Sequence, residues 1–348
     1  MKIGTGISFK DTPGKRVYEA SDNAMAQAVC VRAEIALVFT QSHSEAGYKT
    51  AIETASKVTG AASVIAVAAS GVITEGGEWE KGPSCAVMVF GEDTASKIFT
   101  GTLDVAGHEK EDRLKPEHKA MTASMMVLGD PANLNAGALL RLQNRIKAPV
   151  FGAASSAYLD DDSAAPVLYQ DRWLKDSCAF LSFSKELVAH TGLAHGCKAM
   201  CGPFMVTKSR DALVLELAGK PAARILEREL GRIVAQRKAS CFEKPLPLMA
   251  GVLSRDPVSG QPPQADEFSV RPILGIDSAT GGILLNEGLR EGSYITFVLR
   301  EKMWAKGEIE RGVGAVKERL AGAKPAFGFY YNGVGRGHDL YSQENYDI

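Results

Sequence analysis

Two histidines and two cysteines lie close together in the middle of the chain and are the residues best suited to metal chemistry. His190 and His195 are followed at short spacing by Cys197 and Cys201. Imidazole and thiolate ligands suit zinc, copper or haem iron, and neighbouring thiols can also form a redox pair. The spacing of the cysteines differs from that of a zinc ribbon and also fits a turn or loop. A haem or soft metal site, a thiol redox pair and a structural role all stay open. No base accompanies Cys197 in a recognisable catalytic set.

Arginine side chains suggest a second kind of chemistry, the binding of a small anion. Three of them lie near strand-like runs and glycine-containing turns: Arg271, Arg300 and Arg336. A guanidinium group at such a place can hold a ligand carboxylate through two parallel hydrogen bonds. The alternative is an internal salt bridge to one of three nearby acids, Asp277, Glu301 or Asp339.

Further candidates lie in two polar turns that occupy equivalent places in an internal repeat. A strand, a polar turn, a helix and two further strands over residues 33–90 return in the same order over residues 123–185. The first turn contains His43, and the second contains Asp130 and Asn133. Both turns follow the carboxyl end of a strand, where open α/β sheets tend to bind ligands. The alternative is that these residues only cap the helices that follow.

These elements predict an α+β fold of two domains, each made of mixed β-sheets covered by helices in a layered sandwich. The first domain, residues 1–190, is expected to be internally duplicated. The second, residues 191–348, is expected to contain a hairpin over 270–285, a helix over 303–320 and a final strand over 326–331. We expect the candidate residues to line a cleft between the two domains.

Composition excludes several classes of partner. The 348 residues include 40 Lys and Arg against 41 Asp and Glu, so no basic excess is available to neutralise a nucleic acid backbone. The apolar runs are shorter than the roughly 20 residues that span a membrane, and the first residues do not resemble a secretory signal. Six cysteines in a chain of this length predict reduced thiols. The sequence therefore predicts a cytoplasmic protein with no nucleic acid or membrane partner.

Several short motifs, in this order and spacing, resemble the FIST family, whose chains pair a FIST N domain with a FIST C domain. The resemblance covers nearly the whole chain. Its main motifs are Gly4-Thr5-Gly6-Ile7-Ser8, Glu78-Trp79-Glu80-Lys81-Gly82-Pro83, Leu217-Ala218-Gly219-Lys220-Pro221-Ala222, Arg271-Pro272-Ile273-Leu274-Gly275-Ile276-Asp277 and Gly335-Arg336-Gly337.

The resemblance implies a sensory protein of signal transduction that binds a small ligand, such as an amino acid or another small anion, in its interdomain cleft. One alternative that it implies is a haem-binding sensor of nitric oxide or another gas with a histidine ligand. A second alternative, from the His and Cys residues, is a metal- or thiol-dependent enzyme, although no set of base, nucleophile and orienting residue supports catalysis. The expected partners are the ligand, a separate signalling protein and a second copy of the chain.

Overall fold

The computed structural model describes residues 1–42, 44–80, 82–104, 120–131, 134, 136–156, 167–174, 177–236, 248–254, 268–333, 336–343 and 346. The chain divides into two units. Unit 1 comprises Met1–Ala189 together with Lys324–Ile348, and unit 2 comprises His190–Ala323. The predicted second domain began at residue 191 and ran to the end of the chain, whereas here the last segment belongs to unit 1.

The first sheet of unit 1 is built by the N-terminal repeat. Its elements are β1 (Ile3–Ser8), α1 (Pro13–Ala28), β2 (Ile35–Thr40), α2 (Glu45–Thr59), β3 (Ser63–Ala68), the hairpin β4 (Val72–Thr74) and β5 (Gly77–Trp79), and β6 (Cys85–Phe90). The strand order is β1-β6-β2-β3, extended by β10 (Val167–Tyr169) and β11 (Arg172–Leu174). β2 and β3 are parallel, and the other neighbours are antiparallel.

The second sheet repeats this arrangement. After α3 (Glu92–Ala95), its elements are β7 (Ile98–Asp104), β8 (Thr122–Gly129), α5 (Ala136–Ile146), β9 (Val150–Ala154) and β12 (Ser177–Ser184). The order β7-β12-β8-β9 has the same strand directions as β1-β6-β2-β3, with β8 and β9 parallel. Both halves therefore have the topology that an internal duplication requires.

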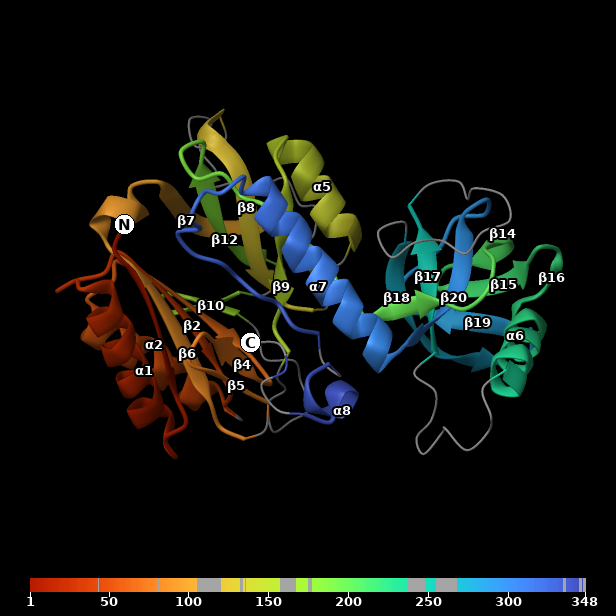
Figure 1. The fold of residues 1–348 in the computed structure, drawn as a ribbon, viewed down its shortest axis with the longest axis horizontal. Coiled ribbons are helices and arrows are strands. Elements are labelled where there is room, and N and C mark those ends of the chain that lie inside the picture. The colour runs from red at the N-terminus through yellow and green to blue at the C-terminus, as the bar shows by residue number, and fades with distance from the viewer. Residues whose placement is uncertain are drawn as a thin grey trace. The chain divides into compact units, whose positions relative to one another are not determined.

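The two sheets and their helices form four layers, because successive strand residues point to opposite faces. In β2, Ala36 and Val38 face α1 and α2, whereas Ile35 and Leu37 face the second sheet. The second sheet packs its other face against α5. Figure 1 shows α1 and α2 together outside the first sheet and α5 on the second. Unit 1 is thus the layered α+β sandwich that the sequence predicts.

The glycines of β1 explain why the first motif of the sequence contains Gly4 and Gly6. A Cβ atom on Gly6 would overlap the carbonyl oxygen of Ala20, and one on Gly4 would overlap that of Ala24. Both overlaps are with the backbone of α1, which cannot move as a side chain can. The two glycines therefore allow α1 to lie directly on β1.

Unit 2 is an antiparallel sheet that closes on itself. Its elements are β13 (Cys197–Ala199), β14 (Phe204–Arg210), β15 (Leu213–Leu217), β16 (Lys220–Pro221), α6 (Ala222–Gln236), β17 (Leu248–Leu253), β18 (Phe268–Asp277), β19 (Gly282–Leu285), β20 (Tyr294–Arg300) and α7 (Lys302–Arg319). β17 pairs with both β18 and β20, which completes the ring β20-β14-β15-β19-β18-β17. Mixed strand directions, predicted for both domains, occur only in unit 1 among the described strands. No helix in the described ranges is long and apolar enough to cross a bilayer.

The C-terminal segment of unit 1, which we call the tail (Lys324–Ile348), corrects one prediction. The strand predicted over 326–331 does not form, although three of its large side chains are still partly buried against the core. Phe327, Phe329 and Tyr331 pack against the core between the two sheets. The tail is therefore held by its side chains rather than by a ladder of backbone hydrogen bonds. It then forms the short helix α8 (His338–Tyr341).

Candidate functional site

A cavity of about 700 Å³ opens where the strands of the first sheet end, and it lies wholly within unit 1. Its described walls come from β2, β3 and the residues just after it, the β4–β5 hairpin, β6, the end of β9, and the tail. The volume falls in the range of about 300–1,000 Å³ typical of small-molecule sites. The predicted location at the carboxyl ends of strands is therefore where the structure has its cavity.

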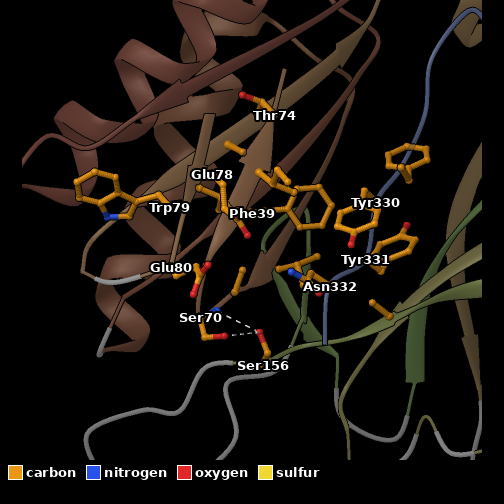
Figure 2. A pocket seen from close by; sticks show the side chains of 18 of the residues that line it. Phe39, Ser70, Thr74, Glu78, Trp79, Glu80, Ser156, Tyr330, Tyr331 and Asn332 are labelled. Atoms are coloured by element: carbon orange, nitrogen blue, oxygen red, sulfur yellow. Dashed lines mark hydrogen bonds between the residues drawn. The ribbon is translucent and has the colours of Figure 1, made fainter. Parts of the chain in front are cut away.

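Two serines from equivalent places in the repeat meet at this cavity. Ser70 follows β3 and Ser156 follows β9, and the backbone N–H of Ser70 donates to Ser156 Oγ at 3.0 Å. The two hydroxyl oxygens lie 3.2 Å apart, and the N–H of Ser156 donates to the carbonyl of Ala68 at 3.0 Å. Figure 2 shows this pair among the side chains that line the cavity, joined by these hydrogen bonds. The serines thus join the ends of the two sheets.

Aromatic side chains form much of the remaining wall. The rings come from Phe39 on β2, Trp79 on β5 and three consecutive tail residues, Phe329, Tyr330 and Tyr331. Phe329 and Tyr331 are stacked, with ring centroids 6.2 Å apart and planes 9° apart. Burial raises the pKa of Tyr331, which keeps its hydroxyl neutral. Such a wall favours a ligand with an apolar or flat body.

One charged group of the cavity wall, Glu80, binds the tail, and another, Arg336, belongs to the tail itself. Both oxygens of the Glu80 carboxylate accept the backbone N–H of His338, at 2.8 and 2.9 Å. Gly337 packs against the same carboxylate, because a Cβ atom there would overlap it. The buried Arg336 donates from Nη2 to the hydroxyl of Tyr341 at 2.7 Å. We call the contacts of Glu80 with Gly337 and His338 the tail latch.

The other two described charges of the wall are Glu75 and Glu78. Glu75 is exposed and accepts hydrogen bonds from Thr5 Oγ1 and Gln27 Nε2, each at 2.5 Å. Partial burial pushes the pKa of Glu75 up, but these hydrogen bonds outweigh it, so that the pKa lies below its usual range. Glu78 differs because its Oε2 atom is buried, and Figure 2 shows its carboxylate pointing toward the ring of Phe39.

The described wall contains no histidine, cysteine or lysine. Among its described hydroxyls, that of Ser70 contacts that of Ser156, and that of Thr5 contacts the Glu75 carboxylate. Hydroxyls, carboxylates and a guanidinium around an aromatic wall can orient a small molecule and release it again. This arrangement is suited to reversible binding.

Of the six residues predicted to bind a ligand, Arg336 is at this cavity. His43 and Asn133 lie outside the described residues. Asp130 follows β8, and its carbonyl accepts the N–H of Leu134 at 2.9 Å. It is not among the described residues of the cavity wall.

The other two predicted arginines belong to unit 2. Arg271, on β18, forms a salt bridge with Glu287 at 2.9 Å and donates to the carbonyl of Val270. This is the internal ion pair that the sequence left open, with a different partner from the acids proposed. Arg300 ends β20, where it lies opposite Cys197 in the sheet.

The His and Cys residues that suggested metal or haem chemistry are engaged elsewhere. Cys197 is buried, and its thiol donates to the carbonyl of His195 at 3.4 Å. His195 Nδ1 is 3.6 Å from Glu308 Oε1, and its ring lies against Phe268. Burial raises the pKa of Cys201, whose sulfur accepts the N–H of Phe297.

These contacts do not bring the four residues together as a cluster of metal ligands. Together with His190, the four residues form no group of three or more ligating side chains within the described parts of the chain. The cavity beside Cys201 measures about 260 Å³, below the usual range for a drug-sized ligand. The haem or soft metal site at these four residues stays a prediction.

The serines, the acids of the β4–β5 hairpin and the aromatic residues of the tail were not predicted from the sequence. Signals for them existed. Both repeats end their second strand in serine, and Glu78 and Glu80 belong to a motif of the family resemblance. The tail could not be assigned, because nothing in its sequence says that it returns to unit 1.

A comparison with protein-family models shows the family. A family model described as the FIST N domain matches residues 34–220, which is more than half of the chain and extends beyond the predicted boundary at residue 190. An uncharacterised protein of Mycobacterium tuberculosis is 23% identical over 356 residues, covering 100% of this chain and 89% of its own length. An uncharacterised protein of Mycobacterium bovis is 27% identical over 145 residues, 41% of this chain and 36% of its own. The FIST C domain expected for residues 191–348 stays a prediction.

Proposed function

This chain belongs to the FIST family, whose FIST domain is a sensory, small-ligand-binding domain of signal transduction, and we propose that it binds an amino-acid-like ligand in the cavity of unit 1. The protein acts in the cytoplasm. The ligand is held reversibly and leaves unchanged. The cavity replaces the interdomain cleft expected from the sequence as the proposed place of binding.

The observation that carries the proposal is the cavity of about 700 Å³, walled by aromatic rings and a few polar groups. Its apolar wall suits the side chain of an amino acid. Its described polar groups include carboxylates, a guanidinium and the hydroxyls of Ser70 and Ser156, so both charged ends of such a ligand have partners. An amino acid bound in a cavity of this volume would be largely removed from water, which favours affinity.

The tail supports a route from binding to signalling. Residues 328–333 of the tail line the cavity, and Lys324, the first residue of the tail, follows Ala323 of unit 2 in the chain. A ligand that contacts both the sheet and the tail stabilises the docked tail by its differential affinity for that state. The docked tail in turn restrains the chain that leads into unit 2. A separate signalling protein, or a second copy of the chain, then reads this restraint.

The test is to fill the cavity and measure binding. Protein purified under mild conditions is denatured, and the released small molecules are identified by mass spectrometry. Ala69→Phe places a ring in the cavity wall, whereas Ala46→Phe, at an exposed position of α2, is the matched control. We expect a bound molecule, or a thermal shift with a panel of amino acids, in the wild type and the control but not in Ala69→Phe. Equal binding in all three proteins would place the site elsewhere and overturn the proposal.

A further inference from the structure

Rings from two separate segments line the cavity of unit 1. Phe39 comes from β2, and Phe329 and Tyr331 come from the tail, where their rings are stacked with planes 9° apart. In Figure 2 the ring of Phe39 points toward Tyr331. A flat ring placed among them makes the offset-stacked or edge-to-face contacts that aromatic pairs prefer, in addition to burying apolar surface. The wall therefore favours an aromatic ring over an aliphatic group of the same size.

Alanine residues at the ends of two strands leave the space that such a ring needs. β3 ends at Ala68, which is followed by Ala69, and β9 ends with Ala153 and Ala154. All four residues line the cavity. Larger side chains at these positions would fill part of its volume. The equivalent strand ends of the two halves of the repeat therefore leave the cavity open to a large, flat group.

The serine pair provides a polar contact beside these alanines. Ser70 and Ser156 together carry two hydroxyl protons, and the hydrogen bond between their oxygens uses one of them. Ser156 Oγ also accepts the N–H of Ser70. Within the described parts of the chain, no hydrogen bond uses the second hydroxyl proton. Whichever hydroxyl donates to the other, the pair can therefore donate one hydrogen bond to an oxygen atom of a ligand.

We propose that the ligand is an aromatic amino acid or a close derivative of one. Its ring lies against Phe39 and the tail, and its carbonyl or carboxylate oxygen accepts the remaining proton of the Ser70–Ser156 pair. This inference rests on the proposed function and narrows it from amino-acid-like ligands in general to those that carry a ring. Because the ring contacts both β2 and the tail, it is also the part of the ligand that stabilises the docked tail.

The first experiment separates an aromatic ring from an apolar group of similar shape. Binding of phenylalanine and of cyclohexylalanine to the full chain is measured by isothermal titration calorimetry. We expect phenylalanine to bind about two- to tenfold more tightly, because cyclohexylalanine has no π-system, and Phe39→Leu to weaken phenylalanine binding by about the same factor. Phe151→Leu is the matched control and should leave that affinity unchanged. Phe151 packs against the same core cluster as Phe39 but is not among the described residues of the cavity wall.

The second experiment tests the serine pair with phenethylamine, which lacks the carboxylate of phenylalanine. Replacing both Ser70 and Ser156 with alanine should weaken phenylalanine binding by about tenfold and leave phenethylamine binding unchanged, because phenethylamine has no oxygen to accept the proton. The matched control combines Ser63→Ala with Thr100→Val, whose hydroxyl oxygens lie 2.9 Å apart outside the described cavity wall. It should change neither affinity. Circular dichroism of each variant shows that it is folded.

The outcomes separate this inference from the proposed function. Cyclohexylalanine binding as tightly as phenylalanine, or the same affinity for phenylalanine in Phe39→Leu as in Phe151→Leu, would overturn the assignment of the ring. Equal losses of phenylalanine and phenethylamine binding in the double serine variant would overturn the assignment of the oxygen. If the purified protein releases an amino acid without a ring, and Ala69→Phe abolishes its binding, the proposed function holds and this inference fails. If Ala69→Phe leaves all binding unchanged, the proposed function itself fails.

Discussion

Replacing Gly337 with alanine is expected to release the tail from the cavity. Gly337 has φ 70° and ψ −143°, a backbone conformation that is nearly restricted to glycine. Its new Cβ atom would also overlap the Glu80 carboxylate. That carboxylate can swing away, but it then loses the N–H of His338. Backbone strain contributes about 1–3 kcal/mol, and the lost charge-assisted hydrogen bond about 1.5–3 kcal/mol. Docking of the tail should therefore weaken by about 2.5–6 kcal/mol.

Hydrogen exchange measured by mass spectrometry tests this expectation directly. Even the lower figure corresponds to an increase of about 70-fold in the opening of the tail, visible as faster exchange of residues 324–343. Gly333→Ala is the matched control, because Gly333 lies in the same segment, has no positive φ and has no atom within 4 Å of the added Cβ. Ligand affinity should fall in parallel in Gly337→Ala. Exchange in Gly337→Ala as slow as in the control would show that the latch does not hold the tail.

Three further predictions concern the stability of unit 1. Gly6→Ala should lower the free energy of unfolding by about 1–3 kcal/mol, since the added methyl group meets the backbone of α1. Gly14→Ala is the control and should not lower it, because no atom lies nearer than 3.6 Å to the added Cβ. Thermal denaturation of the two variants measures the difference. Burial raises the pKa of Cys85 and Cys178 from 9.0 to about 12. The stability that the two protonated thiols contribute to the folded state is therefore intact below pH 9 and is lost as the pH rises toward 12, by up to about 1.4 kcal/mol per thiol and pH unit. Urea titrations from pH 8 to 10.5 should show this slope, and a smaller one when both thiols are replaced by alanine. Ser156→Ala should cost about 1–3 kcal/mol, because it removes the acceptor of the Ser70 N–H, and a change below about 0.5 kcal/mol in urea denaturation would contradict the role of this pair.

The layers of unit 1 could be predicted from the sequence because they follow from local patterns. Each repeat has a strand, a helix with one apolar face and further apolar strands, and the helix over 46–59 is found as α2, Glu45–Thr59. Burying the apolar faces of two such units leaves few arrangements other than stacked sheets with helices outside. The closure of unit 2 was not predictable in the same way. It depends on β17 pairing with β20, two segments that are distant in the chain.

The site was predicted only in its general position. Strand ends line the cavity, and so does Arg336, one of the residues predicted to bind a ligand. The turn residues after β2 and β8 were favoured because both turns are polar and occupy equivalent places at the carboxyl ends of strands. The cavity instead uses the residues after β3 and β9, where Ser70 and Ser156 meet. Which strand ends converge depends on how the two sheets are stacked, and a single sequence does not contain that information.

The two halves of unit 1 use one equivalent segment in different ways, and this difference creates the cavity wall. In each half a hairpin connects the second and the last strand of the repeat. In the second half it is β10–β11, and β10 pairs with β3 and extends the first sheet. In the first half it is β4–β5, which pairs only with itself in the described structure and carries Glu78, with Glu80 just after it.

A hairpin that joins a sheet has its backbone groups fixed by that sheet, and its side chains are committed to the core. A hairpin that stays outside can direct side chains of either charge at a ligand without disturbing the layers. The tail is likewise outside the sheets, and it contributes Phe329, Tyr330 and Tyr331 to the cavity wall. Much of the cavity wall therefore lies in the two segments that the sheets do not hold, the β4–β5 hairpin and the tail. Ligand specificity can change there at little cost to the fold.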